Sequence, residues 1–235
     1  MEYILYFILI PALLPVFLIF RYVYNLDRVE REPLGFVIKV LIYGAIFSIP
    51  CAGVERFFGA VINASYIPGT IEFAFIENTA GVALVEEFSK WLVFMLLVWK
   101  DGNFDYRYDG IVYAVSASLG FAALENILYI VNFGTSVSIG RAIFAIPGHT
   151  TFGVFMGFFL SRAKTAFIDD KVNLAKFLKL LALLVPTVIH GLYDFMLSEE
   201  VAAAGYQFVF YLYVILLDVF AWKIIQHEFK TDRHL

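Results

Sequence analysis

The chain has 235 residues, of which 61% are hydrophobic and only 16% are charged, and its mean hydropathy is +0.80. A soluble domain of this length needs a much smaller apolar share to fill one core, so the composition indicates a membrane protein. The net charge is −4 and the basic residues are dispersed, which gives no sign of a nucleic-acid partner or of a polybasic lipid anchor. The only cysteine, Cys51, excludes an intramolecular disulfide.

Apolar runs determine the predicted architecture. The first residues lack the basic region and the cleavage site of a secretory signal, so they predict an uncleaved first helix. Runs long enough to cross about 30 Å of hydrocarbon cover residues 3–22, 35–54, 75–99, 110–133, 142–160, 178–197 and 208–225. The sequence therefore predicts an all-α polytopic membrane protein of about seven transmembrane helices. Because no repeat or linker is visible, we expect one domain over residues 1–235.

Basic residues gather in alternate connections between these runs. Five Lys and Arg residues follow the fifth run and three follow the first, whereas Arg56 and Arg141 stand alone after the second and fourth. Since basic residues favour the cytoplasmic side of a membrane, the pattern predicts the N-terminus outside and the C-terminus in the cytoplasm. The longest outer connection is expected at residues 55–74.

Ionisable side chains occur inside four of the predicted helices, where they are costly and usually serve a function. Taken singly, some have a structural explanation. Lys90 can neutralise Glu86 one turn away, and His190 with Asp194 can form a core hydrogen bond. The candidate site residues in these helices are Glu86, Glu87, Lys90, Glu125, Asn126, His149, His190 and Asp194.

The depth of these residues favours a common site. At about 1.5 Å per residue, Glu86, Glu125 and His149 lie about 20–22 Å from the cytoplasmic ends of their helices, and His190 about 16 Å. Four helices thus bring acids and imidazoles to one level in the outer half of the membrane. Scattered structural ion pairs would not converge in this way.

Local spacing adds to the expected geometry. Residues three or four apart share a helix face, which groups Glu86 and Glu87 with Lys90. Pro186 frees a backbone carbonyl and predicts a kink beside His190. A separate small-xxx-small pair, Gly153 and Gly157, predicts close packing of the fifth helix on a neighbour.

The expected charge of the site limits its chemistry. Four acids and Lys90 leave a formal −3 if both histidines are neutral, which a cavity of low dielectric constant will not hold. Either some carboxyls are protonated, some histidines are charged, or a cation is bound. The first two cases supply a general acid and base, the third supplies a metal site, and all three lead towards hydrolysis or ion transport.

In combination and in this order, the motifs resemble the PrsW-type intramembrane proteases, distant relatives of the CAAX-processing and bacteriocin-processing membrane proteases. Segments 27–33 and 108–110 also look like that family. A second F-x-x-x-E-N, at Phe73, Glu77 and Asn78, lies at the outer membrane edge and is expected to be structural. The resemblance rests on E-E-x-x-K (Glu86, Glu87, Lys90), F-x-x-x-E-N (Phe121, Glu125, Asn126), P-G-H (Pro147, Gly148, His149) and H-x-x-x-D (His190, Asp194).

The resemblance implies an intramembrane endopeptidase in the cell membrane of a bacterium or archaeon. Its expected substrates are single-pass proteins in the lipid bilayer, typically an anti-sigma factor that receives its first cut on the extracytoplasmic side. The depth of the candidate residues agrees with this side of the membrane.

Two hydrolytic mechanisms remain open at this point. In the first, which needs no cofactor, Glu86 is the general base, Glu125 shares or relays the proton and Lys90 balances the charge. Asn126 and His190, positioned by Asp194, donate to the oxyanion, and His149 is a second acid or donor. In the second, zinc is bound by His149, His190 and Glu125 or Asp194, with Glu86 as the base, although the H-E-x-x-H motif is absent.

A transporter is the alternative from a different class. Intramembrane acids and histidines also form proton relays in carriers. Carriers usually show inverted repeats and paired broken helices, and the sequence shows no such symmetry.

Overall fold

The computed structural model describes residues 5–235, so residues 3 and 4 of the first predicted run lie outside it. Within this range the regular structure is helical, apart from one isolated bridge between Tyr106 and His234. The all-α class is therefore confirmed. The helices are η1 (Leu5–Leu9), α2 (Ile10–Leu26), α3 (Leu34–Ser65), α4 (Ile71–Ile76), η2 (Glu77–Ala83), α5 (Leu84–Leu97), α6 (Asp109–Phe133), η3 (Thr135–Val137), α7 (Ser138–Gly140), η4 (Arg141–Ala145), α8 (Ile146–Ile168), α9 (Val172–Leu197), α10 (Glu199–Ala203) and α11 (Gln207–Lys230).

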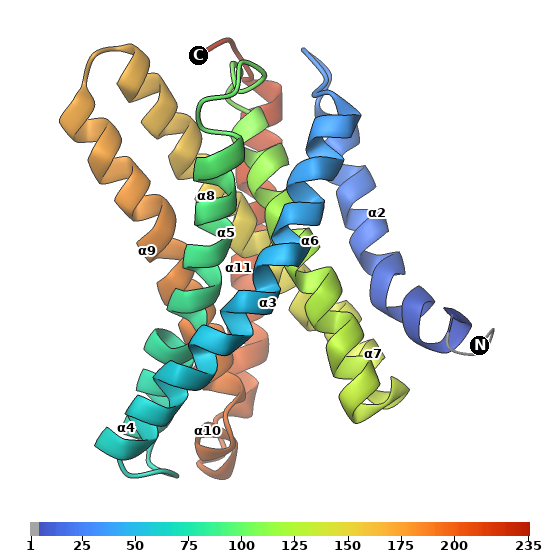
Figure 1. The fold of residues 1–235 in the computed structure, drawn as a ribbon, viewed down its shortest axis with the longest axis vertical. Coiled ribbons are helices and arrows are strands. Elements are labelled where there is room, and N and C mark those ends of the chain that lie inside the picture. The colour runs from blue at the N-terminus through green and yellow to red at the C-terminus, as the bar shows by residue number, and fades with distance from the viewer. Residues whose placement is uncertain (1–4) are drawn as a thin grey trace.

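Five helices are long and apolar enough to cross a membrane, and α2 is a shorter apolar helix. Residues 71–97 form continuous helix through α4, η2 and α5, but this segment contains several charged residues. The start of α2 and the end of α11 lie at opposite ends of the bundle (Figure 1). The five candidate spans are Leu34–Ser65, Asp109–Phe133, Thr135–Ile168, Val172–Leu197 and Phe208–Lys230.

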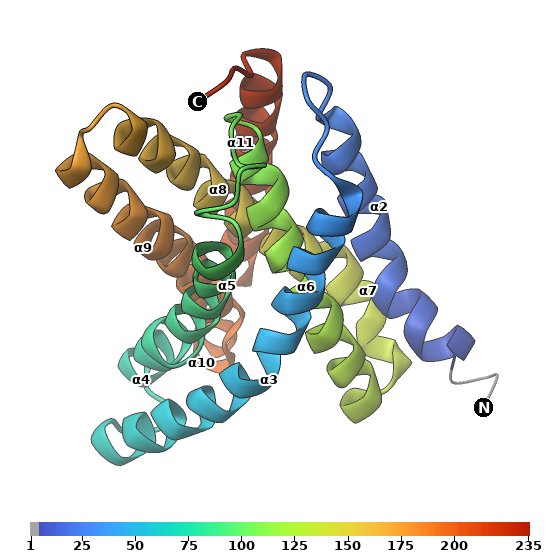
Figure 2. The same ribbon diagram turned by 45° about the horizontal axis from the view of Figure 1, so that its top comes forward.

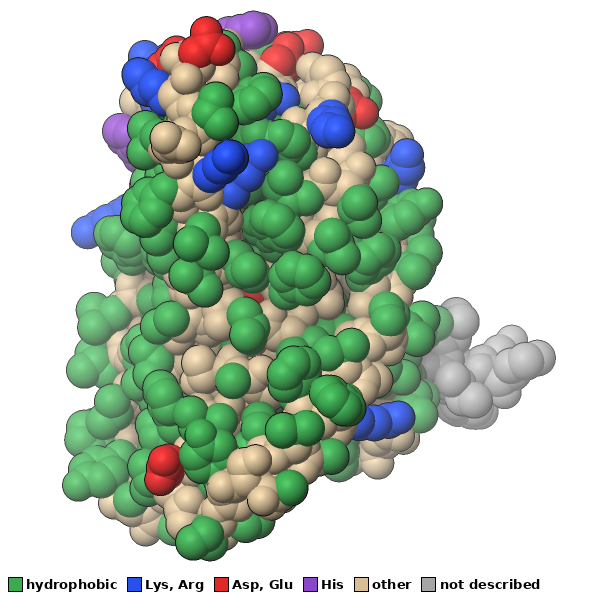
Figure 3. All heavy atoms as spheres, turned by 60° about the vertical axis from the view of Figure 1, so that its left-hand side comes forward, with side chains coloured by type: hydrophobic (Ala, Val, Ile, Leu, Met, Phe, Trp, Pro, Cys, Tyr) green, Lys and Arg blue, Asp and Glu red, His purple; other side chains and the backbone are tan. Residues whose placement is uncertain are grey.

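The outer surface of the bundle is apolar over most of its length. Large hydrophobic side chains such as Ile42, Leu180 and Leu212 are about half exposed. On the face drawn in Figure 3, hydrophobic side chains cover the middle, and charged side chains gather at the end where α11 finishes. An apolar band of this extent matches the hydrocarbon of a bilayer rather than water.

Most of the predicted outer connection at residues 55–74 is helical in the structure. Helix α3 continues to Ser65 and α4 begins at Ile71, so only residues 66–70 lie between the two helices. Gly59 is tolerated inside the helix, and the first proline in this segment is Pro68, followed by Gly69. With 32 residues, α3 is about 48 Å long, more than the hydrocarbon requires, and it runs obliquely across the bundle (Figures 1 and 2).

Helix α6 lies at the centre of the bundle, with α3 on one side and α8 on the other. A Cβ atom at Gly120 would collide with the carbonyl of Leu41 in α3. On the opposite side, a Cβ atom at Gly157 would lie 2.6 Å from Cα of Ile111, and one at Gly153 would also meet the α6 backbone. The predicted close packing of Gly153 and Gly157 is therefore confirmed, with α6 as the partner.

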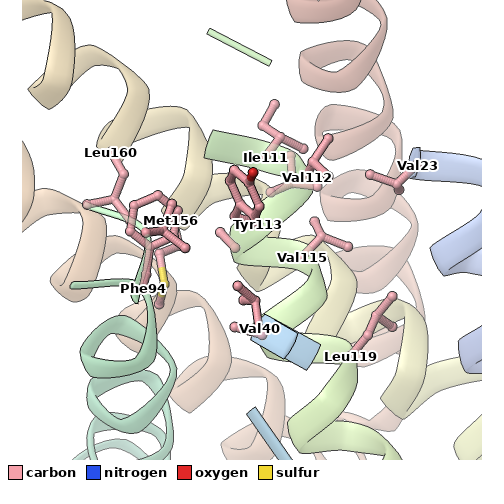
Figure 4. Packing of buried hydrophobic residues seen from close by; sticks show 14 of the residues in the cluster. Val23, Val40, Phe94, Ile111, Val112, Tyr113, Val115, Leu119, Met156 and Leu160 are labelled. Atoms are coloured by element: carbon pink, nitrogen blue, oxygen red, sulfur yellow. The ribbon is translucent and has the colours of Figure 1, made fainter. Parts of the chain in front are cut away.

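Side chains fill the space between these backbones. The main core cluster joins α3, α5, α6 and α8, with Val40, Phe94, Tyr113 and Met156 among its members (Figure 4). All four of these residues are completely buried. This packing fixes the helices that hold the polar residues described below.

The close contacts predict an effect on stability. Replacing Gly44 by Ala is expected to destabilise the protein by about 1–3 kcal/mol, because the added Cβ collides with the backbone of Ala117, which cannot rotate away. Thermal unfolding in detergent measures the change. Gly53→Ala in the same helix is the matched control, since its Cβ meets nothing within 4 Å. An equal response of the two variants would contradict the prediction.

Candidate active site

The ammonium group of Lys90 lies at the centre of a buried polar cluster. Its Nζ donates to Oε2 of Glu86 at 3.1 Å and to Oε1 of Glu87 at 2.7 Å, and lies 2.9 Å from Nδ1 of His149. All four residues are at most 5% exposed. The ring of Phe121 lies 4.6 Å from the same nitrogen. A cation so enclosed lowers the cost of burying the two carboxylates, and it balances one of their two negative charges.

The two histidines extend this cluster to α6 and α9. His149 Nε2 lies 2.9 Å from Oε2 of Glu125, and the two imidazole rings are 5.4 Å apart. His190 Nδ1 lies 3.0 Å from Oε1 of Glu87, and its Nε2 lies 3.1 Å from Oδ2 of Asp194. Every ring nitrogen of both histidines thus has a protein partner.

The structure joins most of the sequence candidates in one network but places one of them differently. Asn126 is fully buried, yet its amide donates to the carbonyl of Ala12 at 3.2 Å and accepts from Nε of Arg141 at 2.6 Å. It therefore supports Arg141 rather than facing the histidines. The candidates in the network are Glu86, Glu87, Lys90, Glu125, His149, His190 and Asp194.

A cavity of about 820 Å³ adjoins the cluster. Glu87 and Lys90 do not line it and lie behind its wall. Asn78, which the sequence assigned to structure, does line it, and its amide donates to the carbonyl of Ala74 at 2.7 Å. The polar side chains that line the cavity include Glu55, Glu86, Glu125, Arg141, His149, His190, Tyr193 and Asp194.

Arg141 is the site residue that the sequence reasoning missed. Its Nη2 lies 3.0 Å from Oε2 of Glu125, without the geometry of a hydrogen bond, and its guanidinium lies 3.8 Å from the ring centre of Tyr129. With Arg141 included, the formal charge of the site is −2 rather than −3. The available signal was a lone basic residue shortly before Pro147, Gly148 and His149.

Widened helical turns precede two of the site segments. The π-helix η2 ends at Ala83, just before Glu86, and the π-helix η4 begins at Arg141 and leads to His149. Such turns shift the phase of the following side chains and are frequent at functional sites. Phe152 then stacks on His190 at 4.4 Å between ring centres, which fixes the orientation of the imidazole.

A membrane-spanning bundle with an acid, lysine and histidine cluster beside an open cavity has the groups that an intramembrane hydrolase needs. The model of the PrsW family intramembrane metalloprotease matches residues 32–221. The chain therefore belongs to the PrsW family and is an intramembrane protease of the cell membrane. Family membership favours hydrolysis over the transport alternative.

Several proteins described as Protease PrsW are similar over most of their length. The one from Oceanobacillus iheyensis is 38% identical over 81% of this chain and 83% of its own. The one from Bacillus subtilis is 34% identical over the same shares. The one from Clostridioides difficile is 32% identical over 91% of this chain and 86% of its own. No solved structure matches the chain.

The family description names a metalloprotease, and the donor set shows whether a metal fits. Glu86, Glu87 and His149 offer ligand atoms within 4.8 Å of one another, but Nζ of Lys90 already contacts all three. A metal-bound histidine keeps one ring nitrogen for the metal, whereas both nitrogens of His149 and of His190 are paired with protein groups. The residues as arranged do not fit a catalytic metal ion, and no step below passes through one.

Proposed function

We propose that the chain is a single-domain intramembrane endopeptidase that cuts single-pass membrane proteins near the extracytoplasmic side, with an anti-sigma factor as the substrate. The five candidate spans, α2 and the continuous helix over residues 71–97 would all cross the bilayer, which makes seven crossings. The N-terminus would lie outside and the C-terminus in the cytoplasm. The opposite positions of the start of α2 and the end of α11 support an odd number of crossings (Figure 1). The basic residues at alternate connections support the orientation.

The proposed chemistry is based on the position of Glu86 at the cavity wall. Its Oε2 is held by Lys90, and no hydrogen bond among residues 5–235 reaches its Oε1. A carboxylate with one oxygen fixed and the other facing a cavity can bind a water molecule and accept its proton. Glu86 is therefore the proposed general base.

The neighbouring groups supply the remaining steps of amide hydrolysis. The activated water attacks the peptide carbonyl carbon, its proton passes to Glu86, and the carbonyl oxygen becomes an oxyanion. Arg141 lines the cavity beside Glu125 and is positively charged, so its guanidinium is the proposed group that stabilises the oxyanion. The hydrogen-bonded pair of Glu125 and His149 is placed to deliver a proton to the leaving amine.

Cleavage of a tagged anti-sigma factor from the same genome tests the function. The purified protein is reconstituted in liposomes with this single-pass substrate, and mass spectrometry locates the cut. We expect a cut near the extracytoplasmic end of the substrate helix. A cut on the cytoplasmic side would overturn the proposed orientation, and an uncut anti-sigma factor beside another cleaved single-pass protein would overturn the proposed substrate.

Arg141 provides a test of the oxyanion step. Arg141→Gln is expected to lower kcat by about 10²–10³-fold, the cost of losing one oxyanion donor, with little change in KM. Steady-state cleavage of a fluorogenic single-pass substrate separates the two constants. Arg56→Gln, at the other isolated basic position, is the control and should leave both unchanged. A rise in KM with unchanged kcat would assign Arg141 to substrate binding instead.

A further inference from the structure

A second group of buried acids lies far along α6 from the active site. Asp27 and Glu32 come from the connection between α2 and α3, and Asp109 is the first residue of α6. Their exposed fractions are 1%, 4% and 0%. One carboxylate oxygen from each lies within 4.8 Å of the other two. We call these three residues the terminal acid cluster.

Donors from the surrounding chain fix each carboxylate. The backbone N–H of Glu32 donates to Oδ2 of Asp27 at 3.0 Å, and the N–H of Tyr106 donates to Oδ2 of Asp109 at 2.5 Å. The hydroxyl of Tyr113 donates to Oε2 of Glu32. Oδ1 of Asp27 and Oδ1 of Asp109 remain buried without a hydrogen-bond partner among residues 5–235. Buried carboxylate oxygens are rarely left unpaired, so these two indicate a missing ligand.

The charge of the cluster also lacks compensation. Its formal charge is −3, and none of the ion pairs within the described part of the chain includes any of the three acids. The N-terminal end of α6 contributes only about half a positive charge. Arg31 is nearby, but its Nε donates to the backbone carbonyl of Asp27 at 3.4 Å. A bound divalent cation would balance most of this charge, and protonation of the carboxyls is the alternative that the test below distinguishes.

We propose that the terminal acid cluster binds one hard divalent cation, such as Mg²⁺, Ca²⁺ or Mn²⁺. Carboxylate oxygens are the ligands that these ions prefer. Two oxygens on one Ca²⁺ ion can be at most about 5 Å apart, which the observed grouping satisfies. The hydrogen bonds from Tyr106 and Tyr113 orient the ligands, as outer partners do in established metal sites.

The ion would tie two distant parts of the chain together. Asp27 and Glu32 bring the α2–α3 connection, and Asp109 brings the start of the central helix. The adjoining tail is already attached there, since Asp232 accepts from the N–H of Tyr108 at 2.9 Å. The site is therefore structural and independent of the proposed proteolytic chemistry.

Binding of Mn²⁺ to the full-length protein tests the proposal. The protein in detergent is stripped with a chelator, and electron paramagnetic resonance then follows the loss of free Mn²⁺, with Mg²⁺ and Ca²⁺ as competitors. We expect one bound ion, a higher thermal midpoint with the ion, and at least about tenfold weaker binding in Asp109→Asn. Asn keeps a carbonyl oxygen for the N–H of Tyr106 and replaces the second carboxylate oxygen by an uncharged amide group.

Further variants locate the ion and show whether a loss of Mn²⁺ binding results from misfolding. Tyr113→Phe retains all three carboxylates and is expected to weaken Mn²⁺ binding by about 10–100-fold. Glu86→Gln and Asp169→Asn, an exposed acid paired with Lys171, should bind Mn²⁺ as the wild type does. Loss of binding in Glu86→Gln would place the ion in the active site. Absence of Mn²⁺ binding would show that the terminal acids share protons instead, and either result overturns the proposal.

Discussion

Glu86→Gln is expected to slow cleavage of a single-pass substrate by about 10²–10⁴-fold, the usual contribution of a general base. Gln has the volume of Glu and can still accept from Lys90, but it cannot take a proton from water. The fold should therefore survive while the reaction is lost. Product formation by purified protein in detergent, together with its thermal midpoint, measures both effects.

The neighbouring acid Glu55 provides the matched control for this substitution. It lines the same cavity, and within the described part of the chain its side chain accepts only from Sγ of Cys51, at 3.2 Å, outside the network around Lys90. Glu55→Gln should change the cleavage rate far less than Glu86→Gln. Normal cleavage by Glu86→Gln would contradict the assignment of Glu86 as the general base.

Lys90→Met is expected to destabilise the protein by about 3–5 kcal/mol, the cost of leaving buried charges without their partner. The ammonium group is completely buried and contacts the carboxylates of Glu86 and Glu87. Unfolding of the detergent-solubilised protein by increasing SDS measures the loss.

A double variant separates the effect of charge from that of packing. Glu87→Gln removes the shortest ion pair of Lys90, at 2.7 Å. Combined with Lys90→Met, it should recover part of the lost stability because one uncompensated charge is gone. If the double variant is less stable than Lys90→Met by the full cost of a separate Glu87→Gln, the charges are not coupled and the explanation is wrong.

Much of the fold could be predicted because the bilayer imposes a simple length requirement. Long apolar runs indicated helices, and each predicted run falls within helix where the structure describes it, except that the run over residues 75–99 extends two residues beyond the end of α5 at Leu97. The end of α3 could not be predicted from hydrophobicity, since a helix that leaves the hydrocarbon can continue until a breaker such as Pro68. Hydrophobicity therefore located the helices but not their ends.

The grouping of site residues could be predicted from depth, but their directions could not. Adjacent helical residues point about 100° apart, so Glu125 and Asn126 cannot both face one cavity from a regular helix. Asn126 accordingly bonds Arg141 and Ala12. The contribution of Arg141 was missed because η4 places this residue beside Glu125, and a widened turn has no clear sequence signal.

The glycine contacts mark two groups of closely packed helices that contribute to the active site. Helices α3, α6 and α8 touch backbone to backbone, and Gly191 brings α9 equally close to Thr79 in η2. Glu125 and His149 belong to the first group, whereas His190 and the helix that follows η2 belong to the second. The 2.9 Å contact between Lys90 and His149 joins the two groups, and α8 also packs closely along α9. Lys90 is therefore the side chain through which the base Glu86 and the proton donor His149 keep their relative positions.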